Sequence, residues 1–259
     1  MTTESIVLVG RERADSARLF ETHADRLRER SGVDAVETAT YETEPVQELR
    51  GQLRELSADR VYAVPMRIAH SHATTRGVPA ALSHVSGEVV YCEPPGRSAA
   101  VTDVVEQKAG EVVPARSDAT LVLVGFGSNS QPEHRRTTER HAERLRERTE
   151  YGEIVSCYLL QNPAVECVRY NVSNPSAVAV PLFLGESEAT AEQIPTELEL
   201  GRGGLEYTGP LAGHPRITDA IHAEVEKRRT LGNAGEEFEA KLTRTQQPVA
   251  TDGDGHSRS

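Results

Sequence analysis

The first half of this sequence recurs in the second half, and this repeat constrains the fold more than any other feature. Ser5-Ile-Val-Leu-Val-Gly10 returns as Thr120-Leu-Val-Leu-Val-Gly125, and His23-Ala-Asp-Arg-Leu-Arg-Glu-Arg30 returns as His141-Ala-Glu-Arg-Leu-Arg-Glu-Arg148. The match continues at an offset of 116 residues, which relates Pro79, Tyr91, Pro94, Thr102 and Asp103 to Pro195, Tyr207, Pro210, Thr218 and Asp219. Because chance similarity would not keep this order, we interpret the chain as an internal duplication.

Each half alternates short apolar runs with longer amphipathic stretches. In the first half, the runs that predict strands cover residues 6–9, 33–40, 60–68 and 88–91. The stretches between and after them predict helices at about 14–31, 45–57, 76–84 and 98–112. Such alternation is typical of a parallel sheet covered by helices on both faces. We therefore expect an α/β protein made of two tandem doubly wound parallel-sheet domains, each with about four strands.

The repeat also sets the expected domain boundaries. Residues 1–113 should form the first α/β domain and residues 119–230 the second, with the segment Pro114–Ala119 as the linker. After about Leu231 the chain is rich in Gly, Glu, Gln and Asp and has no apolar periodicity. We expect residues 231–259 to be a disordered tail, because such a segment has little apolar surface to bury.

The chain is strongly acidic, with 40 Asp and Glu against 29 Lys and Arg and a formal net charge of −11. Nucleic acids and anionic membrane surfaces attract clustered basic residues, so this balance argues against both as partners. The only lysines are Lys108, Lys227 and Lys241, and Trp is absent. This composition resembles that of proteins from salt-loving microbes; an ordinary acidic cytosolic protein is the alternative.

The cysteines and the apolar runs indicate the compartment. Cys92, Cys157 and Cys167 lack the spacing of a zinc knuckle or a disulfide framework. No apolar run approaches the roughly 18 residues of a membrane-spanning helix. The first residues lack the basic and apolar stretches of a signal peptide. We therefore expect a soluble, cytoplasmic protein.

The loops that follow the predicted strands are the expected position of a ligand site. In open α/β sheets, ligands bind outside the carboxyl ends of the strands. These loops cover residues 10–15 and 69–75 in the first half, and residues 125–131 and 185–190 in the second half. If the two halves face each other, the four loops line one cleft.

The second half opens with a strand that ends in Val-Gly and is followed by Gly-Ser, in the segment Leu121-Val-Leu-Val-Gly-Phe-Gly-Ser128. This segment is similar to the Gly-His-Gly-Ser opening of the sirohydrochlorin chelatases of the CbiX/SirB type. The segments from Val64 to Pro79 and from Val180 to Pro195 are similar to its second signature, a Val-Pro-Leu-Phe strand, a loop with a His, and Ile-Pro opening a helix. Tyr91-Cys-Glu-Pro-Pro-Gly96 resembles the segment before its last helix, as does Tyr207-Thr-Gly-Pro-Leu-Ala212. The resemblance covers about residues 5–230.

The resemblance implies insertion of a divalent metal, cobalt or iron, into a tetrapyrrole. It also implies metal ligation by histidines assisted by acidic side chains, and no organic cofactor. The sequence departs from the family pattern where the opening His is replaced by Arg11 and Phe126, and where the loop His is replaced by Ala73 and Ala189. Either the metal site has shifted within the loop or catalysis has been lost.

His70 and His72 are the candidate catalytic and metal-binding residues. Side chains two apart in an extended loop point the same way, so both imidazoles could face one ion. Glu186 and Glu188 hold the corresponding positions of the second half and could complete the coordination or take up protons. The alternative for both pairs is an exposed polar loop. His23 and His141, which match between the halves, are interpreted as surface or interface residues.

Substrate carboxylates could be held by arginines and by a glycine-rich loop. Arg11 and Arg76, together with Arg13 and Arg67, could pair with carboxylates through two parallel hydrogen bonds. Backbone amides around Gly125, Gly127 and Ser128 could hold an anion at the start of the following helix. The alternative for these glycines is a tight turn that the strand–helix connection requires.

The leading hypothesis is a chelatase that inserts cobalt into sirohydrochlorin on the way to cobalamin or a related tetrapyrrole. Iron and nickel are the alternative metals, and the metal ion is a substrate rather than a cofactor. The rival hypothesis is a non-catalytic paralogue that binds a tetrapyrrole or metal for delivery, or supports an active chelatase. A nucleotide-binding α/β protein is disfavoured, because neither a Walker loop nor a dinucleotide fingerprint occurs. A monomer is expected, since the duplicated halves can form the cleft within one chain.

Overall fold

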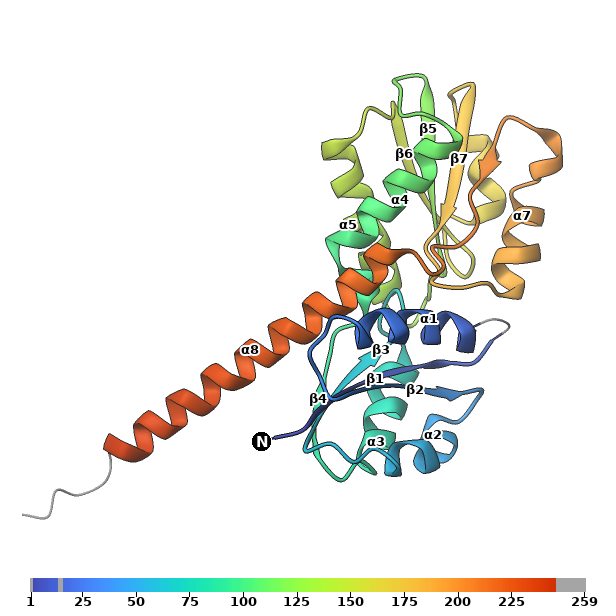
Figure 1. The fold of residues 1–259 in the computed structure, drawn as a ribbon. Helices are drawn as coiled ribbons and strands as arrows, with labels where there is room; N and C mark the ends of the chain where they lie inside the picture. The colour runs from blue at the N-terminus through green and yellow to red at the C-terminus, as the bar shows by residue number, and fades with distance from the viewer. Residues whose placement is uncertain (1, 14–15, 246–259) are drawn as a thin grey trace, which may run out of the picture. The chain divides into compact units, whose positions relative to one another are not determined.

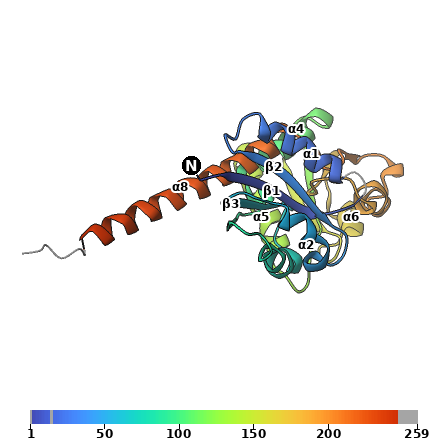
Figure 2. The same ribbon diagram turned by 60° about the horizontal axis from the view of Figure 1, so that its bottom comes forward.

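The computed structural model describes residues 2–13 and 16–245, and it contains two parallel four-stranded sheets. The first sheet has the order β2-β1-β3-β4 and consists of β1 (Glu4–Arg11), β2 (Ala35–Tyr41), β3 (Arg60–Pro65) and β4 (Glu88–Tyr91). Its helices are α1 (Ser16–Arg28), α2 (Pro45–Arg54) and α3 (Val78–Leu82), with the π-helix η1 (Ala73–Gly77) leading into α3. Figures 1 and 2 show α1 and α2 on opposite faces of this sheet.

The second half repeats this topology. Its sheet has the order β6-β5-β7-β8, with β5 (Ala119–Gly125), β6 (Glu153–Tyr158), β7 (Ser176–Pro181) and β8 (Glu206–Tyr207). The helices are α5 (Glu133–Arg148), α6 (Val168–Asn171) and α7 (Ile194–Glu197), and the π-helix η4 (Ala189–Gln193) leads into α7. Both the duplication and the α/β fold with two parallel sheets are thereby confirmed.

Burial explains why the central strands are uniformly apolar. Residues 5–10 of β1 and all of β5 are buried, as expected for parallel strands covered on both faces. The outer face of each sheet has a hydrophobic core of its own, around Leu49 and Leu53 in the first half and around Ile194 and Leu198 in the second. A third core runs through both halves and contains Leu27 of α1 along with apolar side chains from both sheets.

The last helix of each half packs against the other half. Helix α4 (Ala99–Val112) follows β4 but contacts α5 and β7, and Figure 1 shows it beside the second sheet. Conversely, the start of α8 (Pro215–Thr245) is hydrogen-bonded to α1 of the first half. Residues 1–225 therefore form one compact unit. The expected boundaries at 113 and 119 separate the two sheets but do not separate two independent cores.

The repeated His and Thr residues join these exchanged helices. Nδ1 of His23 lies 2.8 Å from Oγ1 of Thr218, and Nδ1 of His141 lies 2.8 Å from Oγ1 of Thr102. Nε2 of His141 also lies 2.7 Å from the carbonyl oxygen of Gly96. Because that carbonyl can only accept, Nε2 carries the proton and Nδ1 accepts from the Thr102 hydroxyl. Of the two interpretations of these histidines, surface and interface, the structure supports the interface.

The same repeat supplies matching ion pairs beside the two buried histidines. Arg30 lies 2.8 Å from Asp219, and the equivalent Arg148 lies 2.7 Å from Asp103. Arg216 adds a second partner to Asp103 at 2.9 Å. Arg30 and Arg148 are the last residues of the two repeated Arg-Leu-Arg-Glu-Arg runs, so the ends of those runs face the exchanged helices. The pairs are partly exposed, and each contributes about 1 kcal/mol or less to stability.

Helix α8 extends beyond the expected domain end. It continues to Thr245, so residues 231–245 are helical where the sequence analysis expected disorder. The segment after Pro215 contains no further proline before residue 248 and is rich in Glu, Ala, Lys, Leu and Arg, which favour helix. The remainder of the expected tail, residues 246–259, lies outside the described residues. Across the described part of the chain, no helix combines the length and hydropathy required to span a membrane.

Acidification should destabilise the protein through His23 and His141. Both side chains are fully buried, and burial lowers the pKa of each from 6.5 to about 4. The unfolded chain therefore binds these protons at a higher pH than the folded chain does. Stability should be complete above pH 6.5 and decline as the pH falls from 6.5 to 4, by on the order of 3 kcal/mol for each histidine.

Chemical unfolding at several pH values across this window measures the effect. The double variant His23→Gln/His141→Gln removes both groups and should show a smaller loss of unfolding free energy on acidification, although it is less stable at pH 7. An equal loss in the variant and the original protein would contradict the assignment.

Candidate functional site

A cavity of about 270 Å³ lies where loops of both halves meet. Its lining comes from the residues after β1, β3, β5 and β7 and from the first turns of α1 and α5. Equivalent positions of the repeat both contribute to it, as the pairs Arg11 and Phe126, Ser16 and His134, Met66 and Leu182, Arg67 and Phe183, Ile68 and Leu184, and Ala69 and Gly185. The cavity is thus a joint product of the two halves, at the carboxyl ends of their strands, as the parallel-sheet rule predicts.

The first half contributes cationic side chains to this cavity. Arg11, Arg13 and Arg67 line it, and Glu186 is the one acidic residue in the described lining. Nε of Arg11 donates a hydrogen bond to the carbonyl oxygen of Glu42 at 2.5 Å. Burial lowers the pKa of Arg67, and the nearby Arg13 and Arg11 lower it further. An arginine still remains charged at neutral pH, so the cavity has a positive excess that favours carboxylate groups.

The second half contributes aromatic rings instead. Phe126 occupies the position equivalent to Arg11. The centroid of its ring lies 6.2 Å from the centroid of the Phe183 ring, in an edge-to-face arrangement. The ring of His134, in the first turn of α5, lies 5.7 Å from Phe126. Phe126 is 39% exposed, so part of its ring is accessible from the cavity or the solvent. This side of the cavity suits a flat apolar group.

His134 is the functional candidate that sequence reasoning missed. Burial, followed by the charge of Arg67, lowers the pKa of His134 to about 4, so the imidazole is neutral at pH 7. The sequence analysis assigned no role to this histidine. The available signal was its position in the first turn after the glycine-rich loop, because that turn lies at the carboxyl edge of the sheet.

The four predicted metal ligands are not brought together. Of His70, His72, Glu186 and Glu188, only Glu186 lines the cavity. His72 and Glu188 are exposed and immediately precede the π-helices, with backbone angles that are already helical. The alternation expected of an extended loop therefore does not apply. In residues 2–13 and 16–245, no cluster of three or more His, Cys, Asp or Glu is arranged to hold a metal ion.

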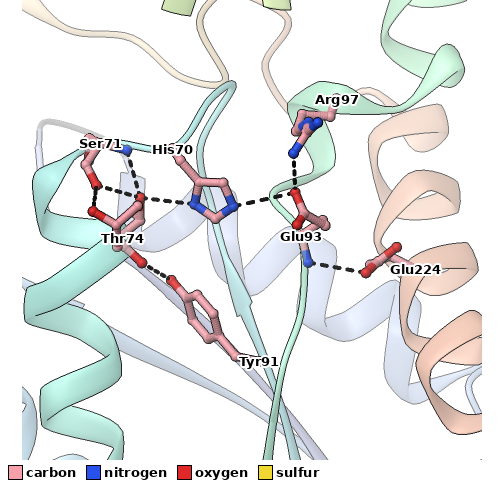
Figure 3. Close-up of polar contacts among 8 residues, drawn as sticks. His70, Ser71, Thr74, Tyr91, Glu93, Arg97 and Glu224 are labelled. Atoms are coloured by element: carbon pink, nitrogen blue, oxygen red, sulfur yellow. Dashed lines mark hydrogen bonds and ion pairs between the residues drawn. The ribbon is translucent and has the colours of Figure 1, made fainter. Parts of the chain in front are cut away.

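His70 instead belongs to a polar network with Thr74, Glu93 and Arg97 (Figure 3). Its Nε2 lies 3.4 Å from Oε2 of Glu93, and its Nδ1 lies 3.3 Å from Oγ1 of Thr74. Oε2 of Glu93 also accepts from Arg97 at 2.6 Å, and the Glu93 amide donates to Glu224 of α8 at 3.2 Å. These contacts connect the loop after β3 to the exchanged helix.

A hydrogen bond within the same network is repeated in the other half. The hydroxyl of Tyr91 donates to the carbonyl oxygen of Thr74 at 2.7 Å (Figure 3). In the second half, the hydroxyl of Tyr207 donates to the carbonyl oxygen of Thr190 at 2.9 Å. Both bonds tie the last strand of a half to the π-helix that follows its third strand. This motif of the repeat therefore positions the loops beside the cavity.

The remaining predicted substrate-binding residues lie outside the cavity lining. Arg76 is exposed on η1. The Ser128 amide donates to Oε1 of Gln161 at 3.0 Å, so it is already used within the protein. Gly127 has a φ of +75°, and a Cβ there would lie 2.8 Å from the side chains of Gln161 and Tyr158. A Cβ on Gly125 would lie 2.6 Å from Thr138. These contacts favour the tight-turn alternative for the glycines.

Both halves of this chain match the same protein family. The model of the CbiX family matches this chain twice, at residues 5–112 and 120–228. The chain belongs to the CbiX family. Both matches contain the four strands of one half, so the family unit corresponds to the repeat unit. The resemblance inferred from the sequence motifs is confirmed.

Individual CbiX relatives are distant in sequence. A probable sirohydrochlorin cobaltochelatase of Halobacterium salinarum is 29% identical over 203 residues, which cover 68% of this chain and 69% of the relative. The structure of SirB from Bacillus subtilis with Fe³⁺ has a TM-score of 0.71 and 19% identity, over 87% of this chain and 95% of SirB. The multi-domain protein DR2241 of Deinococcus radiodurans has a TM-score of 0.69 and 24% identity, over 86% of this chain and 55% of DR2241.

This CbiX protein spans about half the length of DR2241, which is described as a multi-domain protein with structural similarity to chelatases. At these identities, the two solved structures show that the duplicated fold is shared.

Substitution of Gly127 by Ala should destabilise the protein if the glycine-rich loop is a turn. A side chain at positive φ is strained, and its Cβ would also meet Gln161 and Tyr158, so we expect a loss of about 1–3 kcal/mol. Gly110→Ala is the matched control. Gly110 lies exposed in α4 with open space around it, and alanine there should stabilise by about 0.5–1 kcal/mol. Urea unfolding measures both variants, and unchanged stability of Gly127→Ala would rule out the turn requirement.

Proposed function

We propose that this protein is a metal chelatase that inserts divalent cobalt into sirohydrochlorin. Membership of the CbiX family and the similarity to a probable sirohydrochlorin cobaltochelatase support this proposal. The observation that carries it is the composition of the cavity, in which arginines from one half meet aromatic rings from the other. Sirohydrochlorin has many peripheral carboxylates around a flat ring system, and these two chemistries match the two sets of side chains.

The arginines would orient the substrate. Arg11, Arg13 and Arg67 would pair with peripheral carboxylates, because a guanidinium and a carboxylate form two parallel charged hydrogen bonds. Phe126 and Phe183 would then pack against the ring system. Insertion of a divalent ion releases two protons from ring nitrogens, and Glu186 offers a carboxylate at the cavity that could pass them to water. No electron is exchanged in this balance.

We choose cobalt because of the relative from Halobacterium salinarum. Its name specifies cobalt, whereas solved SirB structures carry Fe³⁺ in one case and cobalt in another. Imidazole and carboxylate ligands accept cobalt, iron and nickel alike, so ligand chemistry alone does not separate these metals. We propose cobalt as the substrate metal, with iron and nickel as the ions to compare with it.

A second candidate function is a module that binds a tetrapyrrole or metal for delivery without turnover. The observation that favours it is that the described residues provide no preformed site with three metal ligands. A chelatase, however, must release its metal to the tetrapyrrole, and a site with fewer than three protein ligands releases a metal ion readily. The absence of such a site from the described residues therefore does not exclude a chelatase. Both candidates use the same cavity, and since the two duplicated halves both line it, as two subunits could, we propose a monomer for either.

Metal insertion and the role of Arg67 can be tested together. Purified protein should accelerate the absorbance change of sirohydrochlorin on addition of Co²⁺, relative to a sample without protein. Arg67→Gln should raise KM for sirohydrochlorin by about 10- to 100-fold, the equivalent of one charged hydrogen bond. Arg76→Gln, which removes an exposed arginine outside the cavity, should leave KM unchanged.

The outcomes separate the two candidate functions. Binding of sirohydrochlorin without acceleration by Co²⁺, Fe²⁺ or Ni²⁺ would favour the delivery module. Equal KM values for the two arginine variants would contradict the proposed contact of Arg67 with substrate carboxylates.

High salt should stabilise this protein, as we propose for a halophilic chain. The net charge of −11 implies mutual repulsion of surface carboxylates. Raising KCl from 0.1 M to 1 M shortens the Debye length from about 10 Å to about 3 Å and weakens that repulsion. Thermal unfolding across this range should show a rising midpoint. A midpoint that is constant or falls with KCl would contradict adaptation to salt.

A further inference from the structure

One imidazole reaches the cavity within the described residues, and it belongs to His134. The loop histidines, His70 and His72, are absent from the described lining. His23 and His141 are buried at the helix exchange and hydrogen-bonded to threonines. A ligand that enters the cavity therefore meets the His134 ring and no other histidine of residues 2–13 and 16–245.

The His134 ring also differs from that of His70, because its two nitrogen atoms have no polar partner within the described residues. Within the part of the chain that the structure describes, no hydrogen bond or ion pair involves its Nδ1 or Nε2. The His134 ring contacts the Phe126 ring, with 5.7 Å between the two ring centroids. By contrast, both ring nitrogens of His70 have polar neighbours, Glu93 and Thr74. A half-buried imidazole without such partners keeps a lone pair available to a ligand.

We propose that His134 binds the divalent metal ion in the cavity and transfers it to the tetrapyrrole. This inference rests on the proposed chelatase function. A neutral imidazole is a good ligand for cobalt, nickel and iron. On transfer, the bond between the metal and the imidazole breaks while bonds to the ring nitrogens form. The two protons that leave the ring nitrogens pass to Glu186 and water, so charge and atoms balance.

The charges of the cavity imply an order of binding. Arg11, Arg13 and Arg67 repel a divalent cation while their charges are uncompensated. Substrate carboxylates would neutralise them, and the metal would then reach His134 more easily. Co²⁺ should therefore bind His134 weakly, at millimolar concentration, in the free protein and more tightly once the tetrapyrrole is bound. A weak single-histidine ligand also suits an ion that has to leave.

The test compares His134→Ala in the cobalt insertion assay with the control His84→Ala, which changes a partly exposed histidine outside the cavity lining. We expect His134→Ala to lower kcat/KM for Co²⁺ by about 100-fold, the upper range for removing groups that support a metal ligand. The control variant should remain within about threefold of the original protein. Added imidazole should restore part of the rate to His134→Ala, which a purely structural defect would not allow. His134→Gln keeps the size of the side chain if the alanine variant fails to fold.

A second measurement does not depend on turnover. In protein labelled with ¹⁵N-histidine, Co²⁺ alone should broaden the imidazole signals of His134, which the His134→Gln spectrum identifies. Wild-type insertion rates in His134→Gln, or no broadening of the His134 signals by millimolar Co²⁺, would overturn the role of His134. If the original protein inserts no metal, the proposed function fails, and the broadening experiment still decides whether His134 binds the ion.

Discussion

The exchange of terminal helices between the two halves is the contact on which the rest of the structure depends. Helix α4 leaves the first sheet to pack on the second, and the start of α8 packs against α1. The exchange buries His23 and His141 with their threonine partners and creates the core that runs through both halves. Neither half could keep its inner face buried alone, because the helix that covers it belongs to the other half's sequence. Residues 1–225 therefore behave as one unit.

This arrangement also explains the position and the chemistry of the cavity. The exchange brings loops from the carboxyl ends of both sheets around one space, where equivalent residues of the repeat meet. In two identical chains, the two contributions would have to be the same. Duplication within one chain removes this restriction, and Arg11, Ser16 and Arg67 face different chemistry in Phe126, His134 and Phe183. One half has become cationic and the other aromatic.

Such a division suits a ligand with two kinds of surface. Charged side chains bind carboxylates strongly where they are partly shielded from water, and aromatic side chains gain from contact with a flat apolar ring. The repeated motifs that do not line the cavity have a different role. Tyr91 and Tyr207, like His70, hold the loops in position through hydrogen bonds to neighbouring elements. Sequence similarity between the halves is thus strongest in the supporting structure, and the cavity is where they differ.

The sequence by itself determined the duplication, the strands and the parallel sheets, because apolar periodicity and the repeat are local properties of the chain. It also located the loops at the carboxyl ends of the strands. It did not determine that α4 and α8 change partners, since an amphipathic pattern shows that a helix has a buried face but not which sheet covers that face. The extension of α8 beyond Leu231 was missed because helix-forming residues there lack an apolar stripe.

Only the tertiary structure decided which side chains meet in the cavity. His70 and His72 were expected to point the same way in an extended loop, but helical backbone begins at His72, so the alternation of an extended chain does not apply. His134 is 64 residues from His70, and no sequence pattern singled it out. The packing of the two halves brings it to the cavity with Arg67. Local spacing fixes directions within one element, whereas a site between two sheets depends on how those sheets pack.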